Sequence, residues 1–127
     1  MARTSYVLAL LVALLGLVTA CASPSEKLLA EGMGFLDDAI ALVEQHKGDE
    51  DAIVQALKGY VEAHRDAFRD NTRRGRALLD GMGEADRAAF VQRARDEAAP
   101  RMTRLQTLVA PYKRKVEILA LVSSFNH

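Results

Sequence analysis

Apolar and polar positions alternate with the period of an α-helix along the chain after residue 25. In the first such segment, apolar side chains cover about half of a helical wheel, and acidic and other polar side chains cover the rest. The apolar positions are Leu28, Leu29, Met33, Phe35, Leu36, Ile40, Leu42 and Val43. Gly48 is typical of a helix end, and the acidic residues 49–51 favour a new helix start. The pattern predicts a core-facing helix from about Ser25 to Lys47, with an antiparallel second helix after a short turn.

Two further apolar stripes follow. The second stays in phase from Ile53 to Met82 and predicts one helix of about thirty residues, roughly 45 Å long. Gly81 and Gly83 mark a tight turn after it. The third stripe runs from Phe90 to Leu119. Each stripe is typical of a helix that packs one face against a shared core.

Two prolines decide how many helices the third stripe contains. Pro100 and Pro111 both lie opposite the apolar stripe, where a proline removes a hydrogen bond only on the solvent side. Ala98 and Ala99 precede Pro100 and offer no capping side chain for a new helix. We therefore expect an all-α fold, an elongated antiparallel three-helix bundle whose third helix is long and curved, from about Glu84 to Ser123. The alternative is a four-helix bundle broken near Pro100.

The first twenty residues have the features of an export signal. Arg3 supplies a positive charge, the apolar stretch from Tyr6 to Val18 is too short to span a bilayer, and small residues follow. The sequence Val18-Thr19-Ala20-Cys21 resembles the lipobox of bacterial lipoproteins. This resemblance implies cleavage before Cys21 and acylation of that cysteine with chains such as palmitate. It also implies the outer membrane as the address, because Ala22 stands where an aspartate signals inner-membrane retention in enterobacterial lipoproteins.

This resemblance divides the chain into three expected parts. Residues 1–20 form the signal peptide, residues 21–25 form a lipidated tether, and residues 26–127 form a single helical-bundle domain. Cys21 is the only cysteine, so no disulfide within the chain is expected, and acylation accounts for an otherwise unpaired thiol outside the cytoplasm.

The charge distribution bears on packing and on partners. The signal contains one of the 17 basic residues and none of the 17 acidic ones, so the mature chain is nearly neutral, which argues against nucleic-acid binding. Acidic residues outnumber basic ones over residues 21–50, whereas basic residues predominate over residues 71–127. We expect the acidic first helix to pack beside the basic last one.

Signals of catalysis are weak in this chain. The sequence has no phosphate-binding glycine loop, nucleophile elbow or paired-histidine zinc motif, so we expect no enzyme, no catalytic residues, no metal and no cofactor other than the lipid on Cys21. His64 lies in an apolar stripe between Tyr60 and Phe68. We interpret it as a structural histidine, with ligand contact as the alternative, because its face of the helix offers no second metal ligand.

Two surface features are candidate binding sites. A third helix longer than the second would leave an apolar end projecting past the bundle as a candidate partner-binding site, unless it folds back or caps the turn near Gly48. This end consists of Ile118, Leu121, Val122 and Phe125. Arginines cluster around the second turn, at Arg73, Arg74, Arg76 and Arg87. The short tether places this turn near the bilayer, so the cluster is a candidate membrane-facing surface, with an ordinary solvated charge run as the alternative.

Together these features predict a membrane-anchored periplasmic lipoprotein that acts as a helical protein-interaction module in the cell envelope. We expect its partners to be the lipid bilayer, through Cys21, and another envelope protein. Two alternatives remain open. One is a small-ligand or metal carrier that uses the bundle core near His64, and the other is a chaperone-like helical hairpin.

Overall fold

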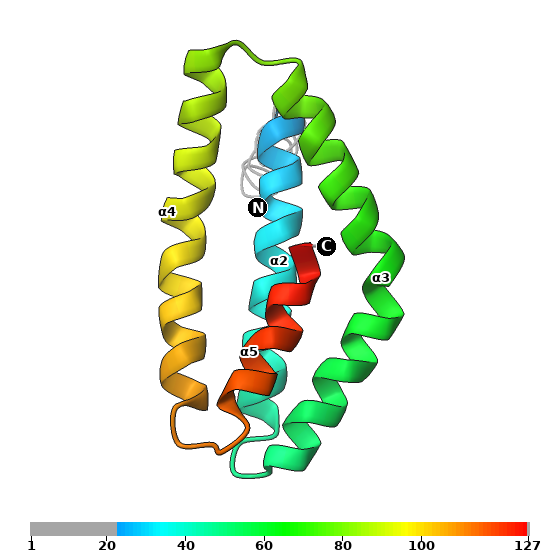
Figure 1. Ribbon diagram of the computed structural model, residues 1–127, viewed down its shortest axis with the longest axis vertical. Coiled ribbons are helices and arrows are strands. Elements are labelled where there is room, and N and C mark those ends of the chain that lie inside the picture. Colours follow the sequence, from blue (N-terminus) through cyan, green and yellow to red (C-terminus); the bar gives the residue numbers. More distant parts are fainter. Residues whose placement is uncertain (1–22, 127) are drawn as a thin grey trace, which may run out of the picture.

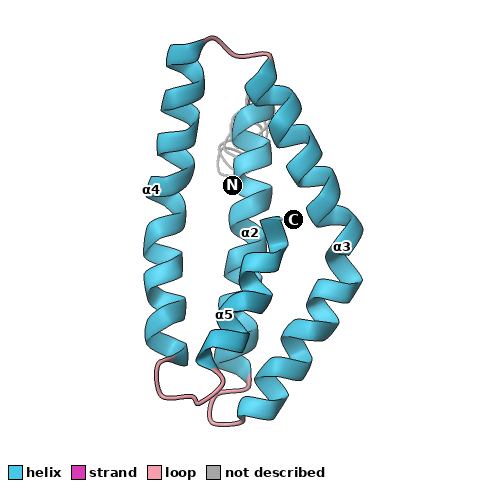
Figure 2. Ribbon diagram, in the orientation of Figure 1, coloured by secondary structure: helices cyan, strands magenta, loops and turns pink. Residues whose placement is uncertain are grey.

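The computed structural model describes residues 23–126, which form four α-helices and a terminal 3₁₀ turn and contain no β-strand (Figures 1 and 2). The elements are α2 (Pro24–Gln45), α3 (Glu50–Asp80), α4 (Glu84–Val109), α5 (Lys115–Ser123) and η1 (Ser124–Asn126). The expected all-α fold is therefore confirmed for this part of the chain. The export segment, the lipobox and Cys21 lie outside the described residues.

Local sequence signals account for the first two helices. The Ser23 hydroxyl accepts a hydrogen bond from the Glu26 backbone N–H at 3.2 Å, and a proline occupies the first turn of α2. Gly48 adopts a φ of 88° between the helices, a value that favours glycine. Asp49 then caps α3 by accepting from the Ala52 backbone N–H at 3.0 Å. Both helices lie within a few residues of the bounds that the pattern predicts.

The third segment differs from the sequence-based expectation. α4 continues through Pro100 and ends at Val109, the chain turns over residues 110–114, and α5 then begins. A single helix from Glu84 to Ser123 is therefore wrong, and so is a break near Pro100. Pro100 is exposed, so its ring meets no packed neighbour, and the Arg101 guanidinium donates to the Glu97 carbonyl at 2.8 Å in the same turn.

Contacts with the turn between α2 and α3 stabilise the corner that follows Pro111. The Gly48 backbone N–H donates to the Tyr112 hydroxyl at 2.7 Å. Arg114 donates from its backbone N–H to Glu50 and from its guanidinium to Asp51 at 2.8 Å. These partners lie more than sixty positions away in the sequence, so tertiary contacts determine which proline ends the helix.

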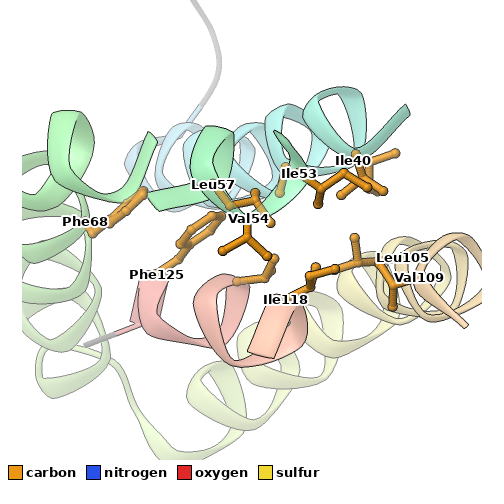
Figure 3. Close-up of a cluster of buried hydrophobic side chains, with 12 residues drawn as sticks. Ile40, Ile53, Val54, Leu57, Phe68, Leu105, Val109, Ile118 and Phe125 are labelled. Atoms are coloured by element: carbon orange, nitrogen blue, oxygen red, sulfur yellow. The ribbon is translucent and has the colours of Figure 1, made fainter. Parts of the chain in front are cut away.

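The fold-back places α5 in the core. α2 packs against both α3 and α4, while α5 packs against α3 and α4 in the half of the molecule near the α2–α3 turn (Figure 1). Side chains from all four helices meet there, and several of them are drawn in Figure 3. The largest fully buried members are Ile53, Val54, Leu57, Leu105, Val109, Ile118, Val43 and Val122.

The candidate partner-binding end is consequently part of this core. Ile118 is 0% exposed, Val122 2% and Phe125 5%, and Leu121 is half-buried. The expectation that these side chains project beyond the bundle is wrong, because the chain reverses at residues 110–114. Folding back removes their apolar surface from water, whereas a straight helix would leave it exposed.

Ion pairs join the acidic first helix to arginines of α4. Arg101 donates to Asp37 at 2.8 Å, Arg93 lies 3.5 Å from Glu26, and Arg104 pairs with Glu44. The acidic first helix therefore packs beside α4, the first part of the segment predicted to form one basic last helix. Pairs at such exposed positions contribute at most about 1 kcal/mol each, so their main effect is on which faces of the two helices meet.

No helix within residues 23–126 is both long enough and apolar enough to cross a membrane.

Candidate functional site

A groove lies in the half of the domain that α5 does not reach. α3 and α4 diverge from the turn that joins them and make almost no direct contact beyond it (Figure 1). α5 and η1 have 9 and 3 residues and span about 20 Å, whereas the 26 residues of α4 span about 39 Å. The space between α3 and α4 is thus filled along only about half its length.

The groove has a volume of about 640 Å³. α2 forms its floor, α3 and α4 form its walls, and Phe125 and Asn126 close the end toward the core. Ligand pockets in proteins typically have volumes of about 300–1,000 Å³, so the groove is large enough for a small molecule.

Apolar side chains make up most of the lining. Leu28, Leu29 and Leu36 lie along the floor, and Phe90 and Val91 lie on the α4 wall. Leu28 and Leu29 are buried, at 5% and 7% exposed, whereas Leu36, Phe90 and Val91 are half-buried and keep part of their surface open to the groove, because α5 ends at Ser123. An apolar concavity of this kind favours occupants that bring apolar surface of their own.

Small residues and one partly buried hydrogen bond set the shape of the groove. A Cβ added at Gly75 would lie 3.6 Å from a methyl group of Leu28, so α3 approaches the floor closely at this point. The Asn71 side-chain amide donates to the Leu28 carbonyl at 3.3 Å across the same junction. On the opposite wall, Ala94 and Ala98 leave room that larger side chains would fill.

The charged residues of the lining are all of one sign. Arg76 on α3 and Arg95 on α4 are the lining arginines, and the lining contains no aspartate or glutamate. Both arginines are exposed, so they lie at the mouth of the groove. Neither makes an ion pair or a side-chain hydrogen bond with any residue from 23 to 126.

The other arginines of the predicted cluster have partners. Arg73 donates to Asp70 at 2.6 Å, and Arg74 donates to Asp70 at 2.8 Å and to Glu31 at 2.7 Å. These hydrogen bonds hold the pKa of Asp70 below its ordinary value. Arg87 donates to the Leu79 carbonyl at 2.8 Å. Of the four arginines, Arg76 is the one without a partner within residues 23–126. A role of this cluster at a membrane surface stays a prediction.

His64 lies outside the groove lining. Its Nδ1 is 2.9 Å from the Tyr60 carbonyl oxygen, which can only accept, so Nδ1 donates within its own helix. The imidazole stacks on the Tyr60 ring with centroids 4.0 Å apart. The part of the chain that the structure describes brings no three His, Cys, Asp or Glu side chains together as metal ligands. Ligand contact by His64 stays an untested alternative.

Aromatic side chains beside His64 attach η1, which follows α5, to α3. Phe68 and Phe125 stack with ring centroids 4.6 Å apart. The Tyr60 hydroxyl donates to Asp38 at 2.7 Å. Burial, followed by this hydrogen bond and the charge of the carboxylate, raises the pKa of Tyr60 above its ordinary value. The cluster therefore links three helices and fixes the closed end of the groove.

The periodicity of the sequence gives no sign of this groove. The apolar residues that line it belong to the same stripes as the core residues, and the short length of α5 leaves several of them, such as Leu36, Phe90 and Val91, only half-buried. Comparison of the chain with protein-family models, curated proteins and solved structures finds no match. The groove and the Cys21 motif are therefore the features that bear on function.

Proposed function

We propose that this chain is a lipid-anchored protein on the periplasmic face of a bacterial outer membrane, and that its helical domain acts by binding. The sequence Val18-Thr19-Ala20-Cys21 supports the anchor. One residue separates Cys21 from Ser23, the N-cap of α2, so α2 begins within about 10 Å of the lipid attachment. The end of the domain that contains the groove then faces the bilayer, because the start of α2 and the α3–α4 turn lie at the same end (Figure 1).

The apolar groove supports the proposed binding role. Its volume suits a small apolar or amphipathic molecule. A stable protein–protein interface usually buries about 1,200–2,000 Å² and uses a broader surface. The apolar C-terminal residues that favoured a protein partner are buried in the core. A small-ligand carrier is therefore the function we propose, with the groove in place of the region near His64.

The experiment uses an unlipidated domain comprising residues 22–127. Every core residue lies between Leu28 and Phe125, so this domain keeps the complete core. We expect the neutral dye N-phenylnaphthylamine to bind with a rise in fluorescence, because the groove removes it from water. Ala94→Phe places a ring in the groove and should reduce the signal at least tenfold.

Ala89→Phe is the matched control. Ala89 is exposed on the same helix and does not line the groove, so this change adds the same ring elsewhere and should leave dye binding intact. Circular dichroism melting of all three proteins checks that each remains folded. Equal dye fluorescence in the two variants, or no dye binding by the unmodified domain, would show that the groove is not the site.

A further inference from the structure

We propose that the occupant of the groove is a single long acyl chain with an anionic head, as in a long-chain fatty acid, and that Arg76 and Arg95 bind its carboxylate. This inference rests on the proposed function, because it names the ligand class of the same groove. Three features of the described residues support it: the charge of the lining, the length of the groove and its position in the domain.

The charge of the lining favours an anion. The two arginines lie on opposite walls, one on α3 and one on α4, and no acidic side chain lines the groove. Most other arginines in residues 23–126 donate to a carboxylate or a carbonyl, as Arg74 does to Glu31 and Asp70. A guanidinium presents planar donors that match a carboxylate, and such charge-assisted hydrogen bonds are among the stronger polar contacts. An anionic head at the mouth of the groove would pair with Arg76 and Arg95, which have no partner within residues 23–126.

The length of the groove suits one acyl chain. Its lining on α4 runs from Phe90 to Met102, which is about 18 Å along the helix axis. The hydrocarbon core of a bilayer is about 30 Å thick and contains two leaflets, so one lipid chain spans about 15 Å. An extended chain can therefore lie along the floor formed by Leu28, Leu29 and Leu36, with its head among the arginines.

The position of the groove favours a ligand from the membrane. Leu28 and Leu29 lie in the first two turns of α2, close to Cys21 in the sequence. The acyl chains expected on Cys21 are themselves a competing occupant. They carry no anionic head, however, and would leave Arg76 and Arg95 without a partner. A free fatty acid uses both the apolar lining and the two arginines.

The test compares three amphiphiles that share one chain and differ in the head: laurate, dodecanol and dodecylamine. Each is titrated calorimetrically, below its aggregation limit, into the unlipidated domain of residues 22–127. We expect laurate to bind about tenfold more tightly than dodecanol. One or two charge-assisted hydrogen bonds at an exposed site would account for a difference in affinity of this size. Dodecylamine should bind most weakly. The advantage of laurate should shrink as salt is added.

The double variant Arg76→Gln/Arg95→Gln should lower laurate affinity to the level of dodecanol and leave dodecanol affinity unchanged. Arg69→Gln is the matched control, because Arg69 is an exposed arginine of α3 that does not line the groove and has no side-chain partner within residues 23–126. It should change neither affinity. Equal affinity for laurate and dodecanol, or no effect of the double variant, would overturn the anion preference alone. Failure to bind dodecanol as well would overturn the proposed function.

Two further experiments test for other occupants of the groove. Light scattering of the domain should give a monomer, and a dimer that Ala94→Phe dissociates would assign the groove to a second copy. The lipidated full chain in phosphatidylcholine vesicles is titrated with laurate against vesicles alone. If the lipidated chain still binds laurate, the groove is free for a separate ligand. If the unlipidated domain binds laurate and the lipidated chain does not, the protein's own acyl chains occupy the groove and the proposal is overturned.

Discussion

Replacing Cys21 with Ser should leave an uncleaved or soluble form of the protein that lacks the acyl anchor. Acyl chains on Cys21 would supply the membrane affinity, since each buried methylene contributes about 0.8 kcal/mol and two or more chains give stable anchoring. No helix in residues 23–126 could take over this role by crossing the bilayer. The measurement is fractionation of cell envelopes after salt and carbonate washes, with incorporation of labelled palmitate as the second readout.

Ala22→Asp is the control for this experiment. It keeps Cys21, so labelling with palmitate and membrane attachment should persist. By the resemblance to enterobacterial lipoproteins, it should also move the protein from the outer to the inner membrane. If Cys21→Ser stayed in the membrane fraction after both washes, the lipobox interpretation would be wrong.

The positions of the helices follow from local sequence, because period and capping act over neighbouring residues. Ser23 and Asp49 accept the first free amides of α2 and α3, and each apolar stripe gives its helix one buried face. These signals need no information about the rest of the chain. They predict α2 and α3 to within a few residues, and they also predict the start of α4.

The end of α4 depends on distant residues and could not be predicted in this way. Pro100 and Pro111 have similar local settings, but only the second is followed by Tyr112 and Arg114, which bond to residues 48–51. One signal of the fold-back was present in the sequence. Residues 118–122 are all apolar and lack the polar face of the other helices, which is typical of a buried helix.

Because of the same fold-back, leucines at equivalent positions in the sequence pattern have different degrees of burial. Leu36, Leu57 and Leu105 each lie at the centre of an apolar stripe. Leu57 and Leu105 are 0% and 1% exposed in the core, whereas Leu36 is half-buried and lines the groove. Periodicity identifies the apolar face of a helix, but the length of the neighbouring α5 decides which part of that face is covered. For the same reason the groove and the role proposed for Arg95 were missed.

The buried position of α5 leads to the second prediction, a large loss of stability when a core side chain of this helix is truncated. Ile118→Ala should lower the free energy of unfolding by roughly 2 to 5 kcal/mol, out of a total of about 5 to 15 kcal/mol. Ile118 is 0% exposed and packs in the cluster that Leu57 and Leu105 also join, so truncation removes buried surface and leaves a cavity (Figure 3). Urea denaturation followed by circular dichroism measures the change.

Val116→Ala is the matched control, because Val116 lies in the same short helix and is 74% exposed. This truncation should change the free energy of unfolding by no more than about 0.5 kcal/mol. The contrast tests the fold-back directly. If α5 continued straight from α4, Ile118 would project into solvent and both truncations would have similarly small effects. A large loss for Ile118→Ala with almost none for Val116→Ala requires α5 to be packed between α3 and α4, the arrangement that closes one half of the domain and leaves the groove open in the other.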